Sequence, residues 1–512
     1  MKRISRSKWL LVVVTLALVS CAGVPYDYPR TSSTTLSADA ETTLGQIDRT
    51  WHTEQGEHSG FYPLRNGIEA LGARLRMMET AQTSIDAQYF IIKPDEAGAL
   101  FTGKLLSAAD RGVRVRLLID DIFTPNVDDA LTLLDSHPNI EVRLFNPLSR
   151  QGFKYWNYLL DFRRANRRMH NKSFTVDNSL SIVGGRNIAE EYFELKQDVK
   201  FDDFEVLAIG PVVKQISTGF DEFWNSDLSV PVAAFGREVD SNNLDHWRRL
   251  IREQTDISSE SLYAQAVNST FVQDIANRRV EPVAAKAELV TDSPTKLLGS
   301  VGDDALATLG REIGRRLRSA QHEILIVTPY FVPQEIGARL LEDCLARGVR
   351  VIVVTNSLAS TNHVPVHAGY SRYRKRLLKA GVEFFEIRVD RPGAETEWGH
   401  RPELITLHSK ASVIDRETIF VGSLNFDPRS LLINTEMGLF IDSADVGKRF
   451  AETVLAELPA TTFRVGMNEN DDLYWVYENG GEREVYRNEP LAGWGRRFMV
   501  PLYRLLPIEN QL

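Results

Sequence analysis

A repeated pattern is the feature that most constrains this chain. The pattern His-x-Lys-x4-Asp occurs once in each half of the 512 residues. Its members are His170, Lys172 and Asp177 in the first copy and His408, Lys410 and Asp415 in the second. In each copy an asparagine, Asn187 or Asn425, follows the aspartate at the same distance, after a turn of small residues. Two patterns with matched tails indicate that one structural unit is repeated.

The repetition extends upstream of both motifs. A strand-like run containing an aromatic pair precedes each copy, and in this comparison Tyr89 corresponds to Tyr330. Further along, Arg111 and Arg347 each open an Arg-Gly-Val-Arg-Val run. All of these equivalents are separated by about 240 residues, so we predict a tandem duplication in which each half is one unit.

Each half shows the alternation of an α/β fold. Residues 85–91 are apolar and aromatic, 100–109 have helical spacing of Leu and Ala, and 113–119 form a β-branched run after a glycine. We therefore predict an α/β protein of two duplicated domains, each a mixed β-sheet flanked by helices. The motifs fall on later strands, where a His and a Lys two positions apart point to the same face.

The motifs, with the tails that follow them, resemble the phospholipase D superfamily. The segments 166–174, 184–188, 367–370 and 506–509 are similar to the bacterial cardiolipin synthases of that superfamily. This resemblance covers most of the chain. It implies that the two phospholipase D-like halves pack together and that both motifs line one active site at their interface.

The paired motifs carry the groups that phosphodiester cleavage needs: a nucleophile, a proton donor, and positive or hydrogen-bonding groups for the phosphoryl oxygens. One neutral imidazole attacks phosphorus to form a phosphohistidine, and the other donates a proton to the leaving oxygen. The resemblance implies that His170 is the nucleophile and His408 the general acid and base. The near-symmetry of the halves leaves that order open.

Other residues of the motifs and their tails are expected to bind substrate or to support the site. Asp177 and Asp415 complete the two catalytic motifs, and their spacing from the lysines indicates structural support rather than direct chemistry. The residues expected at the substrate are Lys172, Lys410, Asn187, Asn425 and Ser423.

Each imidazole also needs an acceptor for its second nitrogen. Glu436 is similar to the acidic partner of the family. Its counterpart in the first half is Asp203, although the intervening segment is longer there, and Asp202 is the alternative.

The sequence contains no close cluster of His and Cys that would bind a metal, and we expect no cofactor. The net charge of −9 argues against broad binding to nucleic acid. A basic run, Arg163 to Arg168, is either a solvated helix face or an attractor of anionic head groups. The segment 494–503 mixes aromatic, basic and apolar residues, which is typical of an interfacial segment or of packing onto the second domain.

The N-terminal sequence predicts where in the cell the protein is located. Basic residues precede an apolar run at 9–19, which is short for a spanning helix, and the four residues ending at Cys21 are similar to a lipobox. The alternative is an ordinary secretory signal with an accidental cysteine. Under the lipoprotein interpretation Cys21 is lipidated, and the protein is anchored to a membrane of the bacterial cell envelope, facing the periplasm.

The expected organisation follows from these features. It comprises a lipoprotein signal peptide (1–21), a flexible tether (22–48), a first phospholipase D-like domain (49–230), a helical connector (231–284), a second phospholipase D-like domain (285–460) and a C-terminal extension (461–512).

The resemblance implies a phosphatidyltransferase that makes cardiolipin. Phosphatidylglycerol would accept a phosphatidyl group from a second phospholipid, either phosphatidylglycerol or phosphatidylethanolamine. A hydrolase of the same superfamily, acting on phospholipid or less readily on nucleic acid, would use the same residues. A catalytically silent scaffold is the third alternative, but it would not require intact His, Lys and Asn in both halves.

Overall fold

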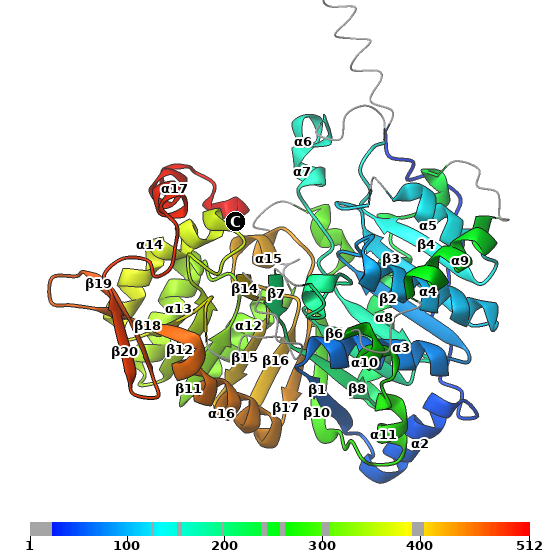
Figure 1. Ribbon diagram of the computed structural model, residues 1–512, viewed down its shortest axis with the longest axis horizontal. Coiled ribbons are helices and arrows are strands. Elements are labelled where there is room, and N and C mark those ends of the chain that lie inside the picture. The colour runs from blue at the N-terminus through cyan, green and yellow to red at the C-terminus, as the bar shows by residue number, and fades with distance from the viewer. Residues whose placement is uncertain are drawn as a thin grey trace, which may run out of the picture.

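The computed structural model describes residues 23–124, 127–150, 156–196, 199–236, 243–255, 262–299, 308–391 and 404–512. The expected signal peptide and Cys21 lie outside these residues. Two α/β halves lie side by side, the first in blue to green and the second in green to orange, with the C-terminal segment in red (Figure 1).

The first half contains a mixed sheet. Strands β2, β3 and β4 are parallel neighbours, and every other pairing in this sheet is antiparallel. The spatial order is β1 (Ser59–Leu64), β8 (Glu205–Ile209), β6 (Leu180–Gly184), β5 (Ser173–Val176), β2 (Ser84–Tyr89), β3 (Arg114–Asp120), β4 (Ile140–Phe145) and β9 (Ser229–Pro231).

The second half repeats this order, which confirms the duplication. Its strands are β10 (Val283–Thr291), β17 (Met437–Asp442), β16 (Thr418–Gly422), β15 (Ala411–Ile414), β11 (Glu323–Val327), β12 (Arg350–Asn356), β13 (Glu383–Ile387) and β18 (Thr462–Met467), followed by β19 (Leu473–Asn479) and β20 (Glu482–Tyr486). Antiparallel pairing of β1 with β10 joins the two sheets, and β7 (Val199–Asp202) pairs with β14 (Leu404–Leu407) across the halves.

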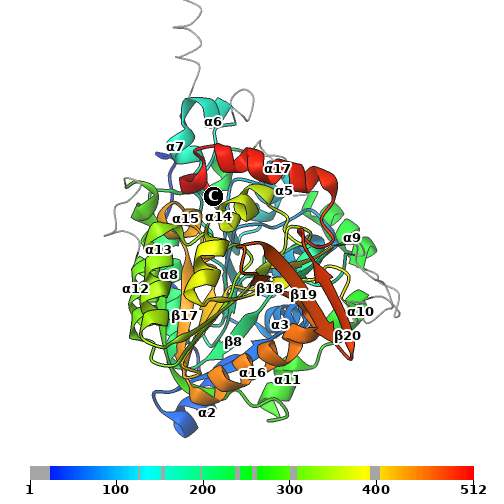
Figure 2. The same cartoon turned by 90° about the vertical axis from the view of Figure 1, so that its left-hand side faces the viewer.

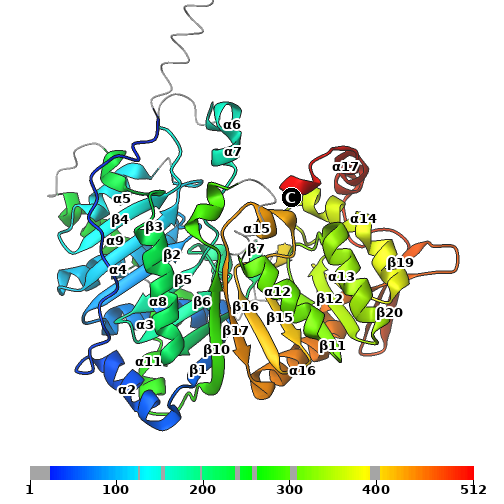
Figure 3. The ribbon, with the colours of Figure 1, turned by 180° about the vertical axis from the view of Figure 1, so that it is seen from behind.

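Helices cover both faces of the strands (Figures 1 and 3). Those of the first half and the connector are α2 (Thr43–Gln55), α3 (Gly67–Thr80), α4 (Glu96–Asp110), α5 (Asp128–Asp135), α6 (Trp156–Leu160), α7 (Phe162–Ala165), α8 (Pro211–Trp224), α9 (Asn243–Thr255), α10 (Leu262–Val267) and α11 (Phe271–Ala276). Those of the second half and the C-terminus are α12 (Thr308–Ser319), α13 (Gln334–Ala346), α14 (Val364–Ala380), α15 (Pro428–Leu432), α16 (Ala444–Thr461) and α17 (Trp494–Leu505). Along the described part of the chain, no helix combines the length and apolar character that crossing a bilayer demands.

Of the four apolar clusters among the described residues, three show how the halves are held. One belongs to the first half and one to the second. The third is shared, because Phe61 and Val206 of the first half pack in it with Leu325 and Leu439 of the second. Burying apolar surface between the halves is favourable, so it fixes the two motif strands relative to each other.

The segment expected to be a flexible tether, 22–48, is bound to the first half in its described part. The buried guanidinium of Arg116 donates to the carbonyl of Ser33 at 3.0 Å. That of Arg143 donates to the carbonyl of Thr31 at 2.6 Å. Buried donors need acceptors, and these backbone carbonyls supply them, so this segment rich in Ser and Thr packs on the first half.

The structure also corrects the register of the repeat. The turn aspartates of the two motifs accept backbone hydrogen bonds at the start of β2 and β11, which makes Ser84 and Glu323 equivalent. On this register Tyr330 corresponds to Ile91 rather than to Tyr89. The two aromatic pairs therefore lie at similar but not identical positions.

Candidate active site

The two motif histidines lie immediately before β5 and β15, at the junction of the halves. The backbone N–H of His170 donates to the carbonyl of Thr435 at 2.9 Å, and that of His408 donates to the carbonyl of Asp202 at 2.7 Å. Each motif is thus held by backbone from the opposite half.

Each imidazole is also oriented by a carboxylate from the opposite half. His170 Nδ1 donates to Glu436 Oε2 at 2.8 Å, and His408 Nδ1 donates to Asp203 Oδ2 at 2.6 Å. Both carboxylate side chains are completely buried. Because Nδ1 is occupied, Nε2 of each ring is left to react. Neither half contains a complete site.

Asp203, and not the alternative Asp202, contacts His408. Strand β7 ends at Asp202, and successive side chains of an extended chain point to opposite sides. The carboxylate of Asp202 forms an ion pair with Arg391, while that of Asp203 turns toward the imidazole.

Each motif lysine contacts the histidine of its own motif. Lys172 Nζ donates to the carbonyl of His170 at 2.6 Å, and Lys410 Nζ donates to the carbonyl of His408 and lies 2.9 Å from its Nδ1. Burial lowers the pKa of Lys172 to about 7 and that of Lys410 to about 8. Each ammonium has three donors, so both lysines retain donors beyond these contacts.

Burial also disfavours charge on the imidazoles. It lowers the pKa of His170 to about 4 although Glu436 opposes the shift, and with the charge of Lys410 it lowers the pKa of His408 to about 3. Burial raises the pKa of both orienting carboxyls, but the adjacent imidazoles and lysines outweigh it and bring the pKa below the ordinary value. Without substrate, the site at neutral pH therefore holds two carboxylates and two neutral imidazoles.

The motif aspartates stabilise the hairpins and do not contact the histidines. Asp177 and Asp415 both have positive φ, 50° and 53°, in the turns after β5 and β15. Their carboxylates accept backbone N–H groups at the start of the neighbouring antiparallel strand, β2 or β11. The donors are Gln82, Thr83 and Ser84 for the first motif and Gln321, His322 and Glu323 for the second.

The two asparagines and Ser423 differ in what they face. Asn187 and Asn425 line the cavity that contains both histidines. Asn425 Oδ1 is buried and has no hydrogen-bond partner among the described residues. Ser423, expected at the substrate, is fully buried instead, and its hydroxyl donates to Glu436 Oε2 and accepts the N–H of Met437. It therefore positions the carboxylate that orients His170.

The cavity between the halves has a volume of about 790 Å³. Aromatic rings surround the histidines at its base. Phe201 stacks on His408 with ring centroids 5.3 Å apart, Tyr192 meets the same imidazole edge-on at 5.1 Å, and Phe90 meets His170 at 5.0 Å. These rings were not predicted as site residues, although Phe90 belongs to the repeated aromatic run.

The lining of the cavity is mixed in polarity. It combines apolar side chains with two guanidinium groups. The apolar members are Ile91, Ile92, Pro94, Ile122, Phe123, Val366 and Leu512, and the polar members include Asn166, Arg168, Arg429 and Asn434. An amphipathic lining of this kind suits a molecule with a charged head and an apolar tail.

The basic run before His170 is not a continuous solvated face. Only Arg168 lines the cavity, where it lies 3.3 Å from Asp120. Arg167 is buried and donates to the carbonyl of Leu297.

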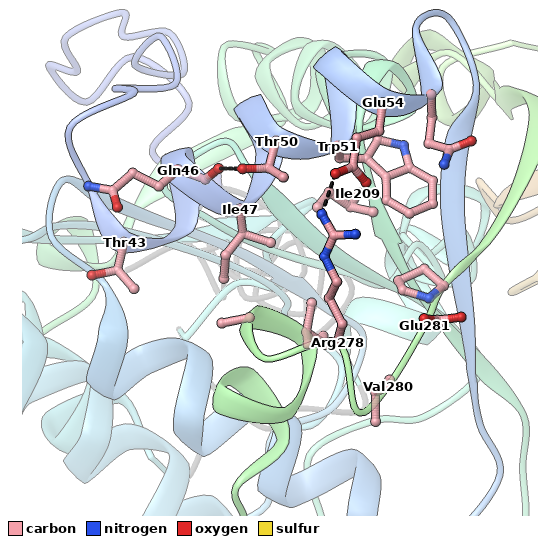
Figure 4. A pocket seen from close by; sticks show the side chains of 14 residues that line it. Thr43, Gln46, Ile47, Thr50, Trp51, Glu54, Ile209, Arg278, Val280 and Glu281 are labelled. Atoms are coloured by element: carbon pink, nitrogen blue, oxygen red, sulfur yellow. Dashed lines mark hydrogen bonds and ion pairs between the residues drawn. The ribbon is translucent and has the colours of Figure 1, made fainter.

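A second hollow, of about 460 Å³, lies between α2 and α11 and contains none of the predicted site residues. An ion pair between Arg278 and Glu54 crosses it (Figure 4). Within the described ranges no three His, Cys, Asp or Glu side chains come together as a metal site would require.

Comparison with known proteins gives the following matches. The family model described as "Cardiolipin synthase, PLD-like domain" matches residues 75–224 and 313–456. Cardiolipin synthase C of Escherichia coli (strain K12) is 36% identical over 455 residues, which is 88% of this chain and 95% of that protein. Cardiolipin synthase A of Pseudomonas syringae pv. syringae (strain B728a) is 26% identical over 77% of this chain and 67% of that protein. The solved phosphatidylserine synthase of Haemophilus influenzae Rd KW20 superposes with a TM-score of 0.56 and 12% identity, covering 91% of this chain and 100% of the other, which shows a shared fold.

Proposed function

We propose, given that the chain belongs to the phospholipase D-like family of the cardiolipin synthases and is an enzyme of the phosphatidyltransferase kind, that it makes cardiolipin through a phosphohistidine intermediate. One observation carries the proposal. Two imidazoles, each oriented through Nδ1 by a buried carboxylate, meet at one amphipathic cavity between the halves.

The first step transfers a phosphatidyl group to the enzyme. Nε2 of His170 attacks the phosphorus of a donor phospholipid, and the bond from phosphorus to the head-group oxygen breaks. The departing alkoxide takes the proton from Nε2 of His408. Positive charge develops on the His170 ring as the P–N bond forms, and the carboxylate of Glu436 at 2.8 Å stabilises it.

His408 takes up its proton from solvent when the substrate binds. The pKa of this imidazole is about 3 in the free site, because burial and Lys410 disfavour its charge. A bound phosphodiester brings a negative charge next to it, and an adjacent opposite charge raises the pKa of an imidazole. Binding of the anionic lipid thus prepares the general acid.

The second step releases the product. The glycerol hydroxyl of a phosphatidylglycerol attacks the phosphorus, Nε2 of His408 takes the hydroxyl proton, and the P–N bond breaks. Cardiolipin forms and His170 returns to its neutral state. Lys172, Lys410, Asn187 and Asn425 bind the phosphoryl oxygens in both steps. Arg168 and Arg429 also line the cavity, where they suit the phosphate of the acceptor lipid.

Attack by the lipid alcohol competes with attack by water. A hydroxyl held close to phosphorus and correctly oriented has an effective molarity that can exceed the concentration of water. The apolar side chains in the cavity lining favour a second lipid over bulk solvent. The donor is phosphatidylglycerol or phosphatidylethanolamine, and the enzyme works at a membrane of the bacterial envelope, to which lipid on Cys21 anchors it.

Lipid analysis tests this function. Expression in cells that lack cardiolipin should restore it, whereas a variant with His170→Ala should not. In mixed vesicles of phosphatidylglycerol and phosphatidylethanolamine, cardiolipin should exceed phosphatidic acid among the products. Dominance of phosphatidic acid at every acceptor density would show a hydrolase with the same catalytic residues.

A further inference from the structure

Helix α17 exposes apolar side chains to solvent. Its inner side packs on α14, and Tyr503 is partly buried. Arg496 donates to the backbone carbonyl of Thr361, just before α14, at 2.7 Å. Its outer side is also apolar, and its members with exposed fractions are Trp494 (80%), Phe498 (54%), Leu502 (42%) and Leu505 (82%). A helix on the surface of a globular protein normally turns a polar face to water.

A second exposed apolar group lies on the first half. Helices α6 and α7 present Leu159, Leu160 and Phe162 to solvent, with exposed fractions of 72%, 55% and 51%. Nearby chain reaches the cavity, because Tyr158 of α6 lines it together with Phe123, which is itself 55% exposed.

Both groups lie at the same end of the molecule, and chain close to each of them lines the cavity. Figures 1, 2 and 3 show α6, α7 and α17 at one end, with the C-terminal residues near the middle of that end. The chain that follows α17 closes the cavity wall with Gln511 and Leu512. We define these two groups, on α6–α7 and on α17, as the apolar rim.

The N-terminal part of the described chain arrives at the same rim. Tyr26 Oη donates to Asn146 Oδ1 at 3.2 Å, and the guanidinium of Arg164, on α7, lies 3.5 Å from the same hydroxyl. Cys21 precedes this residue by only a few positions, and an extended residue spans about 3.5 Å. A lipid on Cys21 would therefore place the bilayer next to α7.

The charge of the rim suits an anionic surface. Between Trp494 and Leu505 helix α17 contains three arginines and no acidic residue, although the whole chain has a net charge of −9. Of these arginines, Arg497 and Arg504 are exposed. Basic side chains flanking apolar and aromatic ones are typical of segments that lie in the head-group region of anionic membranes.

We propose that the apolar rim docks on the surface of an anionic phospholipid bilayer and places the cavity mouth against the head groups. The advantage of docking to the enzyme rests on the proposed function, because a lipid could then enter the cavity without crossing water. The docking itself depends only on the apolar rim, its charge and the path of the N-terminal segment.

Depth-dependent quenching tests the docking. In the full chain, a fluorescent probe is attached to a cysteine introduced by Leu160→Cys or Phe498→Cys, while Cys344 is buried and does not compete. Val485→Cys is the matched control, because Val485 is 54% exposed but lies on β20, away from the rim (Figure 1). The protein is bound to vesicles of phosphatidylglycerol and phosphatidylethanolamine that contain spin-labelled lipid.

Spin-labelled lipid should quench the probes at 160 and 498, and aqueous iodide should quench the probe at 485. Quenching of all three probes by iodide alone would overturn the proposal. So would protection of the rim probes from both quenchers, which would indicate contact with another protein or a second copy of the chain. Repeating the measurement with His170→Ala separates docking from catalysis, because quenching requires no turnover.

The functional consequence is measured separately. Leu160→Ser or Phe498→Ser should lower the ratio of turnover on vesicles to turnover on monomeric short-chain lipid by about tenfold. That is the expected loss in the membrane-binding equilibrium when one buried apolar side chain is removed. Val485→Ser should leave the ratio unchanged. An unchanged ratio in the rim variants would reject the docking surface. Quenching by lipid without any cardiolipin product would leave docking intact and reject the proposed function.

Discussion

The orienting carboxylates offer a test of which histidine is the nucleophile. Glu436→Gln removes the charge that faces His170, and Asp203→Asn removes the charge that faces His408, while both side chains keep their shape. In the structure each carboxylate accepts one imidazole hydrogen bond, at 2.8 Å and 2.6 Å respectively, away from bulk water.

The size of the effect follows from the type of hydrogen bond. A hydrogen bond to a charged group contributes about 1.5–3 kcal/mol, and each 1.4 kcal/mol is a factor of about ten, so loss of the charge should slow the dependent step by about 10- to 150-fold. Ser423→Ala, which removes only the neutral hydroxyl that donates to Glu436, should slow the same step by about fivefold.

The assay uses two donor lipids, a natural one and one whose leaving group is a phenolate that needs no protonation. If His170 is the nucleophile, Glu436→Gln should slow phosphohistidine formation with both donors. Asp203→Asn should slow the natural donor and leave the first turnover of the activated donor nearly unchanged, because the general acid is then not needed. Thermal unfolding of each variant controls for loss of the fold.

Two outcomes would refute this reasoning. If Asp203→Asn slows both donors and Glu436→Gln spares the activated one, then His408 is the nucleophile. If neither variant changes the rate by more than about threefold, then the buried carboxylates do not stabilise charge on the imidazoles at all.

Four further predictions follow from the site. Replacing His170 or His408 by Ala should abolish turnover, and mass spectrometry of His408→Ala treated with the activated donor should find the adduct on His170; an adduct elsewhere would contradict the assignment. Excess chelator should leave activity unchanged, since Lys and Asn side chains meet the phosphoryl charge, and activity that is lost and restored only by a metal would reject this. Because burial lowers the pKa of His170 from 6.5 to about 4, the unfolded chain takes up that proton first, so the unfolding free energy should fall as pH drops from about 6.5 to about 4. In denaturant titrations, His170→Gln should reduce the change of unfolding free energy with pH by about 1.4 kcal/mol per pH unit. An equal pH dependence in both proteins would contradict the lowered pKa of His170. Intact-mass analysis of membrane-extracted protein should find a diacylglyceryl group on Cys21, and a mature chain that starts elsewhere would exclude it.

The sequence alone determined the duplication, the α/β class and the two sets of candidate residues. These properties depend on local sequence patterns: the spacing of His and Lys on a strand, the alternation of strands and helices, and the repetition of both at a constant interval. It also predicted structural support by the motif aspartates, and in the structure Asp177 and Asp415, which lie in the turns after β5 and β15, accept backbone N–H groups.

The tertiary structure decided how the halves complete one another. No local pattern says that Glu436 reaches His170 and Asp203 reaches His408, because these pairs form only when apolar surfaces of both halves pack together. The choice of Asp203 over Asp202 depended on where β7 ends, and the burial of Ser423 depended on its contact with Glu436. The described part of the segment 22–48, whose composition predicted a flexible tether, contacts the first half because buried arginines of that half donate to its carbonyls. Composition and periodicity show which faces of a helix or strand are apolar. They do not show which of these faces pack together, and that packing decides the contacts between residues far apart in sequence.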